Sequence, residues 1–153
     1  MTVVEQELCT KIVRILQERL PDVVVDGNWL PMPTKGAVDG RLSRLDVTVG
    51  PRSYGEFTSL TAEMAVMLEG TIPVGADTTA DRSIAAYSRI VELVEEWHGS
   101  IAAVKRDLAL DSFDPVGLRL DGGTFELDRD TKVRHYSQTF AVRGRIKERN
   151  NRA

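Results

Sequence analysis

The sequence contains a single cysteine and none of the short motifs that mark common catalytic sites. Cys9 has no partner for a disulfide bond or a cysteine metal cluster, and its helical context predicts a small buried thiol. The nucleophile motif G-x-S-x-G, the phosphate-binding motif G-x-x-x-x-G-K-[ST], the dinucleotide fingerprint G-x-G-x-x-G and the zinc motif H-E-x-x-H are all missing. These absences argue against an enzyme, and no metal and no cofactor is implied.

Long apolar runs are missing as well. No run approaches the ~18–20 residues of a membrane helix, and the first residues are acidic and amphipathic, unlike a signal peptide. With 153 residues, of which 42% are hydrophobic and 28% charged, the composition is typical of a globular protein. We therefore expect one domain over residues 1–149, a short disordered tail at 150–153, folding in a cytoplasm and no membrane contact.

Charge is distributed unevenly along the chain, although the net charge is only −3. Residues 1–130 contain 13 Lys and Arg against 22 Asp and Glu, whereas residues 131–153 contain 7 against 1. The net charges of these two parts are therefore −9 and +6. An acidic chain is a poor general binder of nucleic acid, so the basic end needs a more specific explanation.

Hydrophobic periodicity predicts an α+β fold, in which an N-terminal helix and a second long helix pack on a mixed or antiparallel sheet. The predicted helices cover residues 3–20, about 81–97 and 100–110. The predicted strands cover residues 45–49, 62–72, 116–120 and 132–149.

Three finer predictions follow from the same patterns. Apolar residues on both sides of the strand 62–72 predict that it is central and covered on both faces. Asp121-Gly122-Gly123 predicts a turn, with solvated carboxylates around it. The inner face of the second helix is predicted to carry five residues, namely Ile84, Tyr87, Val91, Val94 and Trp97.

Two loops carry large apolar side chains and are candidates for contacts with other subunits. In the segment 26–43, Trp29, Leu30 and Met32 lie on a strip that alternate prolines hold extended. The loop 52–60 presents Tyr54 and Phe57 around a glycine. Each loop either folds back over the core or reaches a neighbouring subunit, since aromatic and Met side chains are enriched at interfaces.

The last predicted strand has an apolar face and a basic face. Arg143, Arg145 and Lys147 occupy alternate positions, so they project together about 7 Å apart. Such a row suits phosphates, or an acidic patch on another copy of the chain. It also suits a solvated edge strand whose cations prevent unwanted pairing. The lack of clustered aromatic residues nearby weakens the nucleic-acid explanation.

The order of these segments over residues 3–147 resembles the tail terminator proteins of long-tailed bacteriophages. The likeness lies in the N-terminal helix VEQELCTKIVRILQERLP, in the strand AEMAVMLEGTIP that leads through GADTT into a long helix, and in AAVKRDLALDSFD. The final strand VRHYSQTFAVRGRI resembles them most, because such proteins typically finish with a Thr-Phe-hydrophobic-Val-basic strand, here residues 139–143.

The resemblance implies a structural virion protein that assembles in the cytoplasm of a bacterial host. Its partners would be other copies of itself in a ring, expected to be a hexamer, together with the tail tube protein and head–tail connector proteins. The ring would stop growth of the tube and offer the docking surface for the head, with DNA only as cargo passing through its lumen. A head–tail connector, tail completion or minor tail protein is the first alternative, and a nucleic-acid-binding module is the second.

Overall fold

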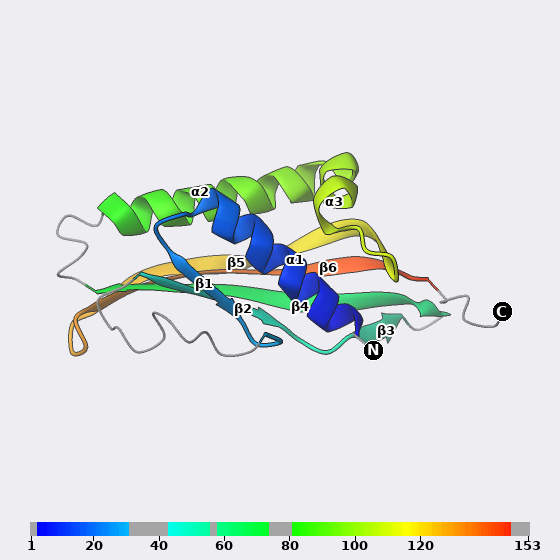
Figure 1. Cartoon of the computed structure of the whole chain (residues 1–153), viewed down its shortest axis with the longest axis horizontal. Coiled ribbons are helices and arrows are strands. Elements are labelled where there is room, and N and C mark those ends of the chain that lie inside the picture. The colour runs from blue at the N-terminus through cyan, green and yellow to red at the C-terminus, as the bar shows by residue number, and fades with distance from the viewer. Residues whose placement is uncertain (1–2, 31–42, 56–57, 74–80, 148–153) are drawn as a thin grey trace.

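The computed structural model describes residues 3–30, 43–55, 58–73 and 81–147 (Figure 1). The chain forms three helices and six strands within these residues, in the order α1 (Val4–Arg19), β1 (Val24–Gly27), β2 (Arg44–Val49), β3 (Ser53–Gly55), β4 (Thr58–Pro73), α2 (Asp81–Gly99), α3 (Ile101–Leu108), β5 (Phe113–Asp128) and β6 (Val133–Ile146). This composition confirms the predicted α+β class. No described helix is long and apolar enough to cross a membrane.

The six strands form one sheet in the order β1-β2-β4-β6-β5, and β3 pairs with β4 at the end that β2 does not reach. The β1–β2 pair is parallel, and the remaining pairs are antiparallel. The long strands β4, β5 and β6 run along the longest axis of the molecule (Figure 1). β6 lies between β4 and β5 and is therefore not an edge strand. The prediction that its cations prevent unwanted pairing at a sheet edge is wrong.

All three helices lie on one face of the sheet. α1 packs on β1 and β2, α2 packs mainly on β6 and β5, and α3 packs on β5. The side chains between these layers form a single buried cluster whose largest members include Trp97, Tyr136, Phe113 and Phe140. Burial of this apolar area is the main force that holds the layers together.

None of the described elements covers the opposite face of the sheet, which we call the uncovered face, contrary to the expectation that β4 is buried on both sides. Met64, Val66 and Leu68 are fully buried under the helices, as predicted. On the other face Ala65 is exposed, and Met67 keeps 41% of its surface accessible. The strand is central in the sheet, as expected. The prediction of burial on both faces is wrong because no described element covers its second face.

The inner face of α2 is rotated from the predicted one. Val94 and Trp97 are buried as expected, but Ile84 is 50% exposed, and Ala86, Ile90 and Leu93 are buried instead. The helix ends at Gly99, and the hydroxyl of Ser100 accepts a hydrogen bond from the Ala103 amide at the start of α3.

The predicted turn at residues 121–123 is also wrong, because β5 continues through it to Asp128. Gly122 has φ +118°, a conformation that glycine adopts at little cost, and the pairing register shifts between Leu120 and Gly122. The glycine therefore forms a bulge in the strand. The chain reverses after Asp128, whose carboxylate accepts hydrogen bonds from the amides of Asp130 and Thr131.

Candidate interaction surfaces

The first candidate loop, residues 26–43, is held at its start by contacts with its own chain. The Trp29 indole donates a hydrogen bond of 2.9 Å to the carbonyl of Val49, and the Leu30 amide donates one to Gly27. Both side chains are partly buried against the core. Trp29 and Leu30 therefore cover one end of the core, which favours the simpler of the two predicted roles, whereas Met32 lies outside the described residues.

Tyr54 projects from β3 and is 54% exposed. The approach to β3 is fixed by Arg52, whose guanidinium binds the carboxylate of Glu5 on α1 at 2.6 Å. Burial acts to raise the pKa of Glu5, but the hydrogen bonds and charge of Arg52 hold it below its ordinary value. Phe57, the other candidate of this loop, lies outside the described residues.

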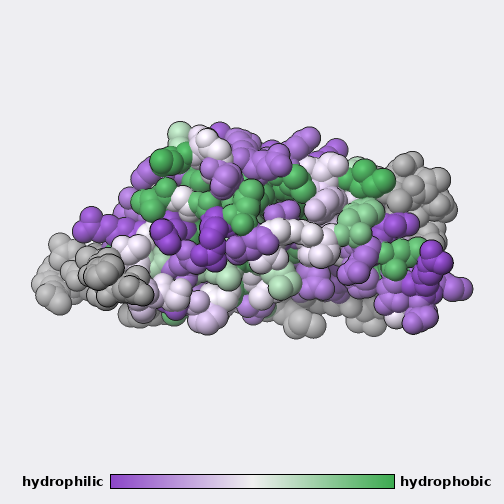
Figure 2. All heavy atoms as spheres, turned by 180° about the vertical axis from the view of Figure 1, so that it is seen from behind, coloured by the Kyte–Doolittle hydropathy of each residue, from purple (hydrophilic) through white to green (hydrophobic). Residues whose placement is uncertain are grey.

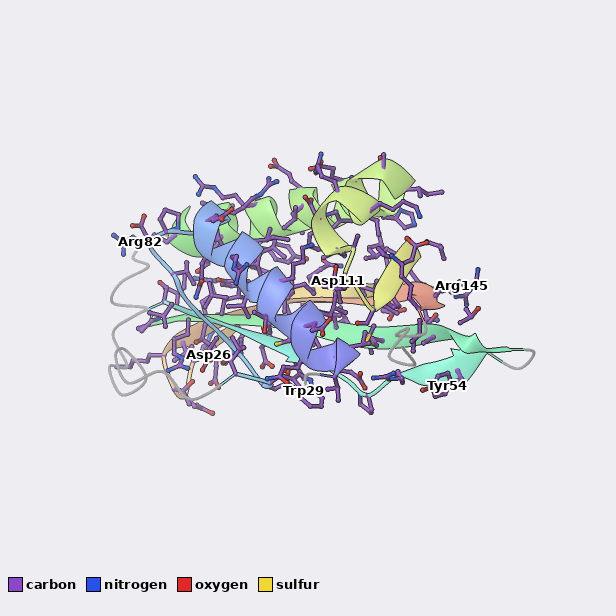
Figure 3. The ribbon with its side chains drawn as sticks, turned by 45° about the vertical axis from the view of Figure 1, so that its right-hand side comes forward. Asp26, Trp29, Tyr54, Arg82, Asp111 and Arg145 are labelled. Atoms are coloured by element: carbon purple, nitrogen blue, oxygen red, sulfur yellow. The ribbon has the colours of Figure 1, made fainter. Side chains whose placement is uncertain are left out.

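The basic residues at the end of β6 lie on the uncovered face of the sheet. Arg143 and Arg145 are both exposed and on this face, and Lys147 follows the strand directly. We call Arg143, Arg145 and Lys147 the basic tip. Arg145 lies at the same end of the sheet as Tyr54 (Figure 3), but cross-strand pairing of Tyr54 with the buried Ala62 assigns the tyrosine to the helix-covered side.

Part of the basic tip is already neutralised within the chain. The carboxylate of Glu63 on β4 forms ion pairs with the guanidinium groups of Arg119, at 2.7 Å, and of Arg143, at 3.5 Å. Among the described residues, neither Arg145 nor Lys147 has an ion-pair partner. The tip therefore keeps two exposed cations available for another molecule.

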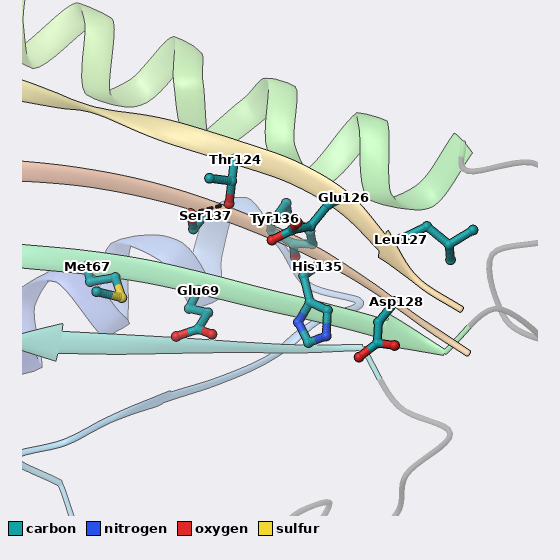
Figure 4. Close-up of a pocket in the computed structure, with 9 residues that line it drawn as sticks. All are labelled: Met67, Glu69, Thr124, Glu126, Leu127, Asp128, His135, Tyr136 and Ser137. Atoms are coloured by element: carbon teal, nitrogen blue, oxygen red, sulfur yellow. Dashed lines mark hydrogen bonds between the residues drawn. The ribbon is translucent and has the colours of Figure 1, made fainter. Parts of the chain in front are cut away.

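Sequence reasoning missed an acidic groove at the opposite end of the same sheet face. Its volume is about 480 Å³. The lining side chains come from β4, β5 and β6, and they include three carboxylates, Glu69, Glu126 and Asp128 (Figure 4). We call these three carboxylates and the space between them the acidic groove.

The acidic groove brings together residues that are far apart in the sequence. Cross-strand pairing sets Glu126 opposite His135 and Glu69 opposite Ser137, which shares a hydrogen bond of 2.7 Å with Thr124. Hydrogen bonds from Thr131 and from the Asp130 amide hold the pKa of Asp128 below its ordinary value. Asp128 is therefore ionised at neutral pH, and only knowledge of the strand register could have revealed the groove.

A third surface is apolar and lies along β5 and the adjacent flank of α2. Ile84, Leu120, Phe125 and Leu127 are each exposed by 37% or more. Figure 2 shows hydrophobic side chains interspersed with polar ones across this side of the molecule. Phe125 packs against Tyr87 of α2 with ring centres 5.7 Å apart, so the surface is continuous between the two elements.

No arrangement of three or more His, Cys, Asp or Glu residues suited to a metal ion occurs in the part of the chain that the structure describes. The absence of catalysis stays a prediction. What the geometry offers is a bare sheet face with charges of opposite sign at its two ends, and this suits binding to other macromolecules.

No family model and no curated protein matches this chain. Among solved structures, it is similar to a chain of the "Virion of native gene transfer agent (GTA) particle", with 16% sequence identity and a TM-score of 0.53. The match covers 92% of this chain and 93% of the other. At such low identity the likeness establishes a common fold.

Proposed function

We propose that this chain is a structural protein of a phage-like virion and that it acts there as the tail terminator. In this role a ring of subunits, expected to be a hexamer, caps the finished tail tube, stops its polymerisation and presents the surface that docks onto the head. The observation that carries the proposal is the fold shared over 92% of the chain with a virion chain. The order of elements, which resembles tail terminators, supplies the finer assignment.

Two features of the described residues support a structural role. The exposed apolar surface of β5 and α2 and the bare sheet face provide contact area of the kind that assembly requires. The role also needs no catalytic chemistry, in keeping with the absence of catalytic motifs from the sequence. A head–tail connector would share these features and differs in the partner that it binds.

The nucleic-acid alternative has less support. Its proposed phosphate ligands were Arg143, Arg145 and Lys147, and Glu63 binds the first of them. A carboxylate beside a phosphate site opposes the bound anion, and the acidic groove repels DNA from the other end of the same face. This alternative is tested by measuring DNA binding at several salt concentrations, and it predicts an affinity that falls steeply as salt rises.

The proposal is tested by imaging the purified chain by negative-stain electron microscopy, alone and mixed with growing tail tubes. We expect rings with a central opening, rings at one end of each tube, and shorter tubes as more of the chain is added. A chain that stays monomeric and leaves tube length unchanged contradicts the proposal. Binding to head-side neck proteins but not to tubes would assign the connector role instead.

A further inference from the structure

The uncovered face of the sheet is electrically bipolar. The basic tip lies at the end of β6, and the acidic groove lies near its start, beside the β5–β6 turn (Figures 1 and 4). Ser137, which lines the groove, and Arg145 are eight residues apart on one strand, which corresponds to about 27 Å. The Debye length at physiological ionic strength is about 8 Å, so the two ends of one chain do not neutralise each other.

The lining of the acidic groove fits a long cationic side chain. Met67 contributes an exposed apolar side chain beside the carboxylates. Lys and Arg combine an apolar stem with a charged head, so the stem can contact the thioether while the head reaches Glu69 or Glu126. A cation of this kind, with no ion-pair partner among the described residues, is present on the same chain at Arg145.

We propose that the acidic groove of one subunit binds the basic tip of a second copy of the chain. Because the two surfaces lie at opposite ends of an elongated molecule, each subunit would use its tip on one neighbour and its groove on the other. Such head-to-tail contacts close into a ring when the rotation between subunits permits it. This inference rests on the proposed ring and names the contact that joins its subunits.

Charge reversal tests the contact directly. The tip variant is Arg145→Glu/Lys147→Glu, and the groove variant is Glu69→Lys/Glu126→Lys; all four positions are exposed. Each variant alone would place like charges together, which weakens association by about tenfold or more. Mixed in equal amounts, the two variants are complementary at both contacts, so we expect assemblies of alternating subunits with the mass of the wild-type assembly.

Controls separate this effect from a general change of charge. Glu92→Lys/Glu95→Lys on the exposed side of α2 matches the groove variant in charge, and Arg14→Glu on α1 changes charge in the same direction as the tip variant. Both controls should assemble like the wild type. Circular dichroism and thermal unfolding establish that every variant is folded, and mass photometry measures the assemblies.

Different outcomes bear on the inference and on the proposed function separately. Rings that persist in both variants, or a mixture of folded variants that fails to assemble, overturn the tip–groove contact and leave the terminator proposal standing. Loss of tube binding by the tip variant with intact rings assigns the tip to the tube protein and also overturns the contact. A charge-swappable dimer supports the contact and contradicts the ring, whereas a wild-type monomer contradicts both.

Discussion

At the residue scale, the packing of α2 on the sheet depends on one glycine. Gly70 on β4 pairs with Tyr136 on β6, and a Cβ atom at residue 70 would overlap the Tyr136 ring. That ring also packs against Tyr87 of α2, with ring centres 6.3 Å apart. The absence of a side chain at Gly70 is therefore what permits the Tyr136 ring to pack over residue 70, where it contacts Tyr87 of α2.

Gly70→Ala should lower the free energy of unfolding by about 1–3 kcal/mol, because the added methyl group forces the tyrosine out of its position. Urea unfolding followed by circular dichroism measures the change. Gly117→Ala is the matched control, since a Cβ atom there meets nothing within 4 Å. Equal stability of the two variants would contradict the packing described for Tyr136.

Individual burial was predictable only in part. The helical context of Cys9 correctly predicted a buried thiol, and burial raises its pKa. Ile84 was placed in the core because it shares a helical stripe with Tyr87 and Val91, yet it is exposed. The α2 sequence has apolar residues on more than one stripe, and only the position of the sheet decides which of them is buried.

At the scale of elements, one ion pair joins the first helix to the segment before β3. Glu5 on α1 is buried, with a side chain only 9% exposed, and Arg52 binds it through the Nε and Nη2 atoms. The Arg52 amide donates to the same carboxylate. The pair therefore fixes the position from which β3 presents Tyr54.

Arg52→Ala should destabilise the fold by about 1–3 kcal/mol at neutral pH, because it leaves the buried Glu5 carboxylate without its charged partner. In the wild type the pKa of Glu5 lies below its ordinary value, so the stability from this group is present above about pH 4.5 and is lost as pH falls through the lowered pKa. In the variant the Arg52 side chain no longer lowers the pKa of Glu5, so burial, which raises it, is opposed only by the backbone hydrogen bonds.

The difference in stability between wild type and Arg52→Ala should therefore shrink on acidification below about pH 4. Urea unfolding at pH 7 and at about pH 3.5 measures it. Lys105→Ala, which removes an exposed ion pair with Asp114, is the control and should have a smaller effect at neutral pH. A difference that is independent of pH would show that the pair acts through packing alone.

The secondary structure was largely predictable, but the pairing of the strands was not. The spacing of apolar residues predicted the bounds of α1, β2, β4 and β6 to within a few residues. The bulge at Gly122 was mistaken for a turn, because an Asp-Gly-Gly sequence suits both. The contact between Glu63 and Arg143, 80 residues apart, and the assembly of the acidic groove both depend on cross-strand register, which single-strand periodicity does not contain.

At the scale of the whole molecule, the charge asymmetry of the sequence differs from that of the surface. The C-terminal part of the sequence is basic, yet β6 begins at the acidic groove and ends at the basic tip. Arg134 near the start of β6 lies over the ring of Phe125 at 5.6 Å, and Phe125 pairs with the buried Tyr136 on the helix-covered face of the sheet. The fold therefore places an acidic groove and a basic tip at the two ends of one sheet face.

Salt distinguishes the two surfaces through which copies of such a molecule can associate. Raising NaCl from about 0.1 to 1 M shortens the Debye length from about 10 to 3 Å, so a contact between basic tip and acidic groove should weaken and the assemblies should lose mass. A contact through the apolar residues Ile84, Phe125 and Leu127 would persist or strengthen. Sedimentation velocity at both salt concentrations measures this, with Glu69→Lys/Glu126→Lys as the control whose association should not fall with salt. Wild-type assemblies that grow with salt would assign the subunit contact to the apolar surface, because screening cannot strengthen an attraction between opposite charges.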